Sequence, residues 1–229
     1  MLFVGDARIP EIAKEKLARL GTFVPFQTSG ITYEAISGHP DIFFCYSGDL
    51  LVAAPNTPAK YLQILKEHNI HFEKGTLPVG SKYPETARYN ASVSDDYLIH
   101  NIHISDESLK RVFNNRMRIF ISQGYARCSM VPMKNGAFIT SDAGIYRTLK
   151  NTEVKIDYFS PKGILLPGFK YGFLGGTMGL FEDKAYLLGA LKFYPEGDTL
   201  GEVLTKAGYE IIELYQGLLF DGGSLMIFP

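Results

Sequence analysis

One order of segments recurs along the chain: a short apolar strand, a tight polar turn, a second strand, a helix and a third strand. Complete copies begin at IFFCY (42–46), YNASVS (89–94), CSMVPM (128–133) and GTMGLF (176–181). Gly and Asn in the turns SGD and KNG accept the positive φ that hairpins favour. The expected helices span 57–68, 106–115, 143–150 and 198–207. The turns recur at roughly 40 to 48 residues, which indicates repeated supersecondary units.

A fifth copy is divided between the two ends of the sequence. DGGSLMIFP (221–229) contains a first strand only, whereas LFVGD (2–6), a helix over 10–21 and TFVPF (22–26) provide the rest. We therefore expect the first and last strands to pair. The sequence predicts an α/β fold of five ββαβ-type repeats closed into a pseudo-five-fold ring, an α/β propeller, in a single domain over 1–229. One open sheet with helices on both faces is the alternative.

Composition argues against several classes of function. A formal net charge of -1 and a pI near 6.5 provide no basic surface for nucleic acid or an anionic membrane. No apolar run approaches the roughly 20 residues of a membrane span, and the first residues lack a signal-peptide pattern. Cys45 and Cys128 lie outside any CxxC or Cys/His motif. Their positions predict that both thiols are free and that the protein is cytoplasmic. We expect no metal and no cofactor, and the oligomeric state stays open.

The five-unit pattern resembles the pentein fold of the guanidino-modifying enzymes, which include arginine deiminases, agmatine deiminases and dimethylarginine dimethylaminohydrolases. GHPDIFF (38–44) is similar to the Gly-His-x-Asp segment of the agmatine deiminase group. That resemblance implies a general base at His39 and a guanidinium-binding carboxylate at Asp41. DGGSLMI (221–227) is similar to the Gly-Gly segment that leads into the catalytic cysteine. The segment 123–147 resembles a family of uncharacterised bacterial proteins of the same fold.

One departure from that pattern concerns the nucleophile. Ile227 stands where the deiminases have their C-terminal cysteine, so the usual thiol does not carry over. In a ring of equivalent units, the start of each first strand is expected to face the centre, and this places Cys128 there. The neighbouring Arg127 is expected to favour its thiolate. The predicted catalytic residues are Cys128, His39 and Asp142, and the predicted substrate-binding residues are Asp41, Arg127, Asp221 and Asp6.

Each candidate also has a structural interpretation. Cys45 is expected in the core, and Cys128 fits a small strand residue as well as a site thiol. His39 fits a solvated loop, and Asp142 fits the N-cap of the next helix. Three functions therefore stay open. They are a guanidino-modifying hydrolase relative with a rearranged or degenerate site in the central channel, a non-catalytic protein that binds a guanidinium or amine, and an interaction scaffold. The expected partner is a small molecule.

Overall fold

The computed structural model describes residues 1–229 as a mixed α/β protein built from small sheets. In five three-stranded sheets the first strand pairs antiparallel with the second, and the second pairs parallel with the third. Four of these sheets are continuous in sequence: β3 (Phe44–Tyr46), β4 (Leu51–Ala53) and β5 (Glu73–Lys74); β6 (Ser92–Val93), β7 (Tyr97–His100) and β8 (Met117–Phe120); β9 (Met130–Pro132), β10 (Phe138–Thr140) and β11 (Ile156–Tyr158); β13 (Met178–Phe181), β14 (Lys184–Leu187) and β15 (Glu210–Glu213). The predicted strand order is therefore present in each copy.

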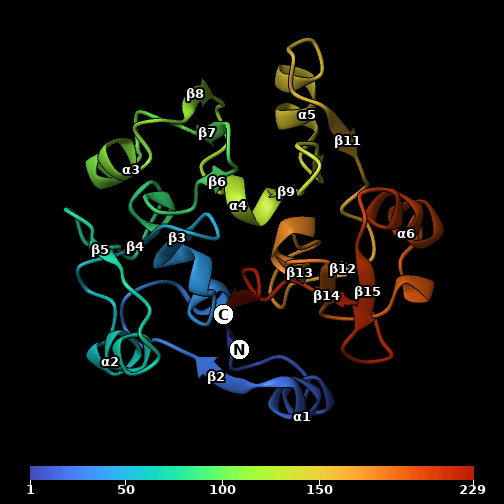
Figure 1. Ribbon diagram of the computed structural model, residues 1–229, viewed down its shortest axis with the longest axis horizontal. Helices are drawn as coiled ribbons and strands as arrows, with labels where there is room; N and C mark the ends of the chain where they lie inside the picture. The colour runs from blue at the N-terminus through green and yellow to red at the C-terminus, as the bar shows by residue number, and fades with distance from the viewer.

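The fifth sheet joins the two ends of the sequence. It consists of β17 (Met226–Phe228), β1 (Leu2–Asp6) and β2 (Thr22–Phe26). Leu2 pairs with Phe228 and Val4 with Met226, so the predicted pairing of the first and last strands is confirmed. Figure 1 shows the N and C marks close together near the centre of the view.

Each sheet has a helix between its second and third strands, as the repeats predicted. These helices are α1 (Glu11–Leu20), α2 (Ala59–Glu67), α3 (Glu107–Val112), α5 (Ala143–Leu149) and α6 (Gly197–Lys206). They lie at the outside of the molecule in Figure 1. Helix α6 buries Leu200 and Leu204 and half-buries Val203, which is the predicted apolar face. No helix combines the length and the apolar character needed to span a membrane.

The first strands of all four complete copies, β3, β6, β9 and β13, begin two or three residues later than the sequence predicted. Cys128 lies in a short helix, α4 (Ala126–Ser129), ahead of β9, and Asp41 lies in a 3-10 turn over Pro40–Ile42 ahead of β3. The reason is visible in the backbone hydrogen bonds. Arg127 N donates to the carbonyl of Asn90, and Asp41 N donates to that of Gly223. These segments thus bond to neighbouring repeats instead of their own strand partners.

One sheet lies outside the repeat. Strand β12 (Ile164–Leu165) pairs parallel with β16 (Leu219–Phe220) in a two-stranded sheet that the sequence did not predict. It ties the segment after β11 to the segment before β17. The Asp221 amide, next along the chain, donates to the Leu165 carbonyl over 2.9 Å. This sheet therefore helps to fix the position of Asp221.

Candidate functional site

The segments that precede the first strands of several sheets meet and exchange hydrogen bonds. The thiol of Cys128, ahead of β9, donates to Asp41 Oδ2, ahead of β3, over 3.0 Å. Ser224 Oγ, ahead of β17, donates to the same oxygen over 2.9 Å and to the carbonyl of Gly175 over 3.1 Å. Side chains from well-separated parts of the sequence are thereby joined, at positions that the repeats predicted to face a common centre.

Asn90 holds the cysteine in place from the preceding repeat. Its Oδ1 accepts from the backbone N–H of Cys128 over 3.1 Å, and its Nδ2 lies 3.2 Å from the sulfur. The same Nδ2 donates to the carbonyl of Asp41 over 3.1 Å. Asn90 and Ser224 lie at the starts of predicted first strands, which were expected to face the centre, but neither was predicted to have a role. Their repeat-equivalent position was the signal that could have identified them.

The Cys128 thiol is protonated in this arrangement. Burial raises its pKa well above the ordinary value, and the charges of Asp41 and Asp221 act in the same direction. The charges of Arg127 and the Cys128 thiolate attract, in the predicted direction, but burial and the two carboxylates outweigh this attraction in the ligand-free site. Arg127 donates through one terminal nitrogen to the Gly175 carbonyl over 3.0 Å.

The Arg127 side chain lines a cavity of about 400 Å³ that also contains Ser224 and residues of the hairpin turns. Asp6, His39 and Asp41 do not line it. Arg127 lies near enough to Asp41 for their charges to attract, but its guanidinium is bonded to the Gly175 carbonyl, so the substrate site proposed below does not include it.

His39 is buried, with an exposed fraction of 1 %, so the solvated-loop alternative is wrong. Its backbone N–H bonds to the Ile36 carbonyl, and Gly223 packs directly against it. A Cβ added at Gly223 would lie 2.1 Å from the Cβ of His39. Neither ring nitrogen has a hydrogen-bond partner, and the closest charged group is Asp6, whose Oδ2 is 3.8 Å from Nε2. Buried polar atoms are nearly always satisfied, so these two nitrogens indicate a position that a ligand completes.

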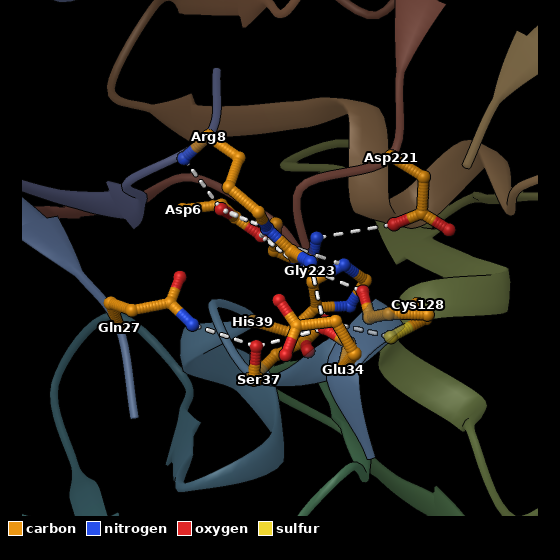
Figure 2. Close-up of polar contacts among 12 residues, drawn as sticks. Asp6, Arg8, Gln27, Glu34, Ser37, His39, Cys128, Asp221 and Gly223 are labelled. Atoms are coloured by element: carbon orange, nitrogen blue, oxygen red, sulfur yellow. Dashed lines mark hydrogen bonds and ion pairs between the residues drawn. The ribbon is translucent and has the colours of Figure 1, made fainter. Parts of the chain in front are cut away.

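His39, Asp41 and Cys128 form what we call the central triad. One nitrogen, one carboxylate oxygen and the sulfur all lie within 4.8 Å of one another, and all three residues are buried. Figure 2 shows His39 close to Gly223, with Asp221 opposite. Asp41 Oδ1 is a third buried atom without a hydrogen-bond partner. The sequence predicted no metal site because it considered contiguous motifs, whereas these three donor types come together only in space.

Asp6 is already occupied by a guanidinium from its own chain. Arg8 donates to Asp6 from its backbone N–H at 2.7 Å and from Nε at 2.9 Å, and its terminal nitrogen lies 2.5 Å from Oδ2. Arg8 also donates to the carbonyls of Glu34 and Ala35. Asp6 therefore holds Arg8 and faces His39, as Figure 2 shows, and its predicted contact with substrate would require Arg8 to move.

Asp221 lies on the other side of the central triad with its carboxylate bound by backbone amides. Phe173 N donates to Oδ2 over 2.8 Å and Gly223 N to Oδ1 over 3.1 Å. Burial raises the pKa of Asp221, while the nearby His39 acts in the opposite direction. A bound cation would favour the charged carboxylate, so the geometry suits the predicted role of Asp221 in holding substrate.

Asp142 is the N-cap of α5, the structural alternative to its predicted catalytic role. Its Oδ1 accepts from the Ile145 N–H over 2.8 Å at the start of α5, and its Oδ2 accepts from Gln123 Nε2 over 2.7 Å. None of its hydrogen bonds reaches the central triad. We therefore treat Asp142 as an N-cap and leave its predicted catalytic role out of the mechanism below.

Two tyrosines lie near the site. The hydroxyl of Tyr33 lies 3.3 Å from that of Tyr125, which in turn lies 2.6 Å from Thr86 Oγ1. Burial and the Tyr125 hydrogen bond raise the pKa of Tyr33, and the charges of Cys128 and Asp221 add to the shift. Sequence reasoning did not identify Tyr33, because its loop carries no motif.

Comparisons with known proteins agree with this architecture. A family model described as "Family of unknown function (DUF6873)" matches residues 4–226. No curated protein sequence matches the chain. Among similar solved structures is SxtG, an amidinotransferase from Microseira wollei in the saxitoxin biosynthetic pathway, with a TM-score of 0.57 and 11 % identity over 92 % of this chain and 87 % of that chain.

A second similar structure is a mutant of DDAH from Pseudomonas aeruginosa complexed with citrulline. Its TM-score is 0.53 with 8 % identity, over 91 % of this chain and 82 % of that chain. Both proteins are members of the pentein superfamily, so the resemblance to proteins of this fold is confirmed, while the closure of the five repeats into a ring stays a prediction. At these identities the likeness establishes the fold alone.

Proposed function

We propose that this chain, which belongs to the family of unknown function DUF6873, modifies a small guanidino compound through the central triad. The observation that carries the proposal is the convergence of a thiol, an imidazole and a carboxylate within 4.8 Å of one another. Nucleophilic catalysis at a guanidinium carbon needs these groups: a sulfur nucleophile, a proton acceptor and a counter-charge. The similarity to an amidinotransferase and to DDAH supports the same substrate class.

The proposed reaction has two steps. His39 takes the proton from the Cys128 thiol, and the sulfur attacks the central guanidinium carbon to form a C–S bond. The C–N bond to the leaving amine then breaks, and that amine takes the proton from His39. Water, or an acceptor amine, next attacks the same carbon and breaks the C–S bond, which returns the thiol. Asp41 and Asp221 pair with the guanidinium N–H groups throughout.

Substrate binding has to create the reactive thiolate, because the empty site keeps Cys128 protonated. A guanidinium beside Asp41 compensates the negative charge that raises the cysteine pKa. It also competes with the thiol for Asp41 Oδ2, the oxygen that the thiol now bonds over 3.0 Å. The Cys128 proton is then free to pass to His39, whose ring nitrogens have no other hydrogen-bond partner.

The proposal includes the whole-chain architecture. Five equivalent sheets in one pseudo-five-fold ring, forming a single domain over 1–229, would place five equivalent positions at the centre. Any repeat could then supply the nucleophile. Ile227, at the position of the usual cysteine, packs into an apolar cluster with Phe3 and Leu225. Cys128 lies two residues ahead of β9, as Ser224 lies two residues ahead of β17, so Cys128 is the repeat equivalent of Ser224. The cytoplasmic location stays a prediction.

A non-catalytic guanidinium-binding protein is the second candidate. It is favoured by the protonated thiol and by the burial of the central triad, with exposed fractions of 1 %, 0 % and 3 % for His39, Asp41 and Cys128. Such a protein would keep the carboxylates and never form the C–S bond. We retain the interaction scaffold only as the outcome in which no small guanidino compound binds.

One experiment separates these functions. Thermal unfolding is measured with arginine, agmatine, methylated arginines and creatine, and release of ammonia, amine or urea is assayed in parallel. A ligand at 100 times its dissociation constant adds roughly 2.7 kcal/mol, a rise of roughly 5 to 10 °C in Tm for a chain of this size. We expect a rise that Asp41→Asn removes, and turnover that Cys128→Ala removes but Cys45→Ala retains. A rise without turnover supports the binding protein, and a flat panel contradicts both.

A further inference from the structure

We infer that the central triad is also a binding site for a thiophilic divalent metal ion, Zn²⁺, with His39, Asp41 and Cys128 as its protein ligands. The inference uses the residues of the proposed function but not the proposed reaction. It rests on three independent features: the distances between donor atoms, the unsatisfied buried atoms and the chemistry of the donor set.

The donor atoms are close enough to share one ion. Their mutual distances are all within 4.8 Å, and the sulfur is 3.0 Å from Asp41 Oδ2. In tetrahedral zinc sites with bonds of about 2.0 to 2.3 Å, donor atoms are separated by roughly 3.3 to 3.8 Å. Side-chain shifts of about 1 Å or less therefore suffice to coordinate an ion between the three residues.

The buried atoms without partners are the ones that a metal ion would use. His39 Nδ1 and Nε2 and Asp41 Oδ1 are all buried and make no hydrogen bond. Nε2 is 3.8 Å from Asp6 Oδ2, so a ring that binds the ion through Nδ1 keeps its Nε2–H for Asp6. Ligating histidines commonly donate to a carboxylate in this way, which fixes the ring. Arg8 holds Asp6 in position for that contact.

The donor set selects the type of ion. One thiolate, one imidazole and one carboxylate suit Zn²⁺, whereas Mg²⁺ and Ca²⁺ prefer oxygen ligands only. The thiolate and the carboxylate together neutralise the charge of the ion, and the proton displaced from Cys128 passes to solvent. Three protein ligands leave a fourth position for water, and Ser224 Oγ, 2.9 Å from Asp41 Oδ2, lies close enough to hydrogen-bond such a water.

The test is a titration of the full chain, freed of metal with a chelator, with Co²⁺ as a spectroscopic substitute for Zn²⁺. We expect one equivalent to produce a sulfur-to-cobalt charge-transfer band that Zn²⁺ then removes. Cys128→Ser should abolish the band and His39→Gln should weaken binding at least 10-fold. Cys45→Ser is the matched control, because Cys45 is a buried thiol in the apolar core, and it should leave the band unchanged.

The metal site and the proposed function can each be refuted without refuting the other. Absence of a charge-transfer band in the folded wild-type chain, or a band that survives Cys128→Ser, overturns the metal site. Circular dichroism confirms that each variant is folded, and His39→Gln provides a second test if Cys128→Ser does not fold. Guanidino turnover is assayed separately with chelator present, so turnover without metal binding refutes only the metal site. Metal binding without guanidino binding or turnover refutes only the proposed function.

Discussion

At the scale of single residues, Gly223 determines whether His39 can take its place in the site. It has a φ of +64°, and an added Cβ would lie 2.1 Å from the His39 Cβ. Gly223→Ala thus combines backbone strain with a collision against the base. Its backbone N–H also donates to Asp221, so the same residue positions two functional side chains.

We predict that Gly223→Ala destabilises the fold by at least about 2 kcal/mol and removes the response to guanidino ligands. Gly136→Ala is the matched control, because Gly136 has a φ of +77° and open space around its Cβ position. The control should lose only about 1 kcal/mol from backbone strain and retain ligand binding. Denaturant unfolding measures both stabilities. Equal losses in the two variants would show that the contact with His39 is unimportant.

A second prediction concerns His100, which is fully buried between Ser105 Oγ and the Gly124 carbonyl. Burial lowers its pKa from 6.5 to about 4. Between these pH values His100 is therefore protonated in the unfolded chain and neutral in the folded chain. Protonation of His100 in the unfolded chain should lower the free energy of unfolding by roughly 3 kcal/mol as the pH drops from about 7 to 4. Above pH 7 this residue should cause no change of stability with pH.

Denaturant unfolding at several pH values checks this effect. His100→Gln should flatten the pH dependence over that interval, whereas the same change at the exposed His103 should leave it unaltered. An unchanged slope in His100→Gln would mean that the buried imidazole is not the group that titrates.

The residues of the central triad could be predicted from the sequence, but the orientations of the neighbouring charged side chains could not. Equivalent positions in repeated units are brought together by the architecture, so Asp41 and Cys128 were predictable from their place in the repeat. His39 was instead predicted from the resemblance of GHPDIFF to the Gly-His-x-Asp segment. The direction of the Arg127 side chain and the pairing of Asp6 with Arg8 depend on local backbone turns. No periodic pattern encodes those turns.

At the scale of elements, helix starts were predicted well and the starts of first strands were not. Capping is local, since a side-chain oxygen bonds an N–H two or three residues on. The lengths of β6 and β9 instead depend on bonds to other repeats, such as Arg127 N to the Asn90 carbonyl. Capping residues can be read from a single sequence, whereas hydrogen bonds between repeats cannot.

Asp142 offers the test at this scale, because it was predicted both as a catalytic residue and as the N-cap of α5. We expect Asp142→Ala to cost about 1 kcal/mol of stability, a fall of roughly 2 to 4 °C in Tm. Asp142→Asn retains a capping oxygen and should cost less. Ligand binding and turnover should be unchanged in both variants, and a loss of turnover in the folded Asp142→Asn chain would restore the catalytic role.

At the scale of the whole molecule, the pairing of β1 with β17 links the two ends of the sequence. The repeats predicted this pairing because a divided unit is completed only when its two parts meet. The sheet formed by β12 and β16 was not predictable in the same way, since it lies outside the repeat and its strands have two residues each.

A circular permutant tests whether the chain is one closed cooperative unit. The ends are joined by a short Gly/Ser linker, and new ends are made at the exposed turn between Asn135 and Gly136. We predict a single unfolding transition and an intact central triad, whereas a chain ending at Leu225, which lacks β17, should not fold stably. Two separate transitions in the permutant would contradict a single domain over 1–229.

The most direct test of the central claim is mass spectrometry of Cys128 during turnover. The chain is mixed with a guanidino compound that raises its Tm, quenched in acid and digested. We predict an amidino adduct on the Cys128 peptide and none on the Cys45 peptide, with turnover reduced by about 10³-fold or more in Cys128→Ala. Consumption of the ligand by Cys128→Ala at the wild-type rate, with no adduct on Cys128, would contradict the account.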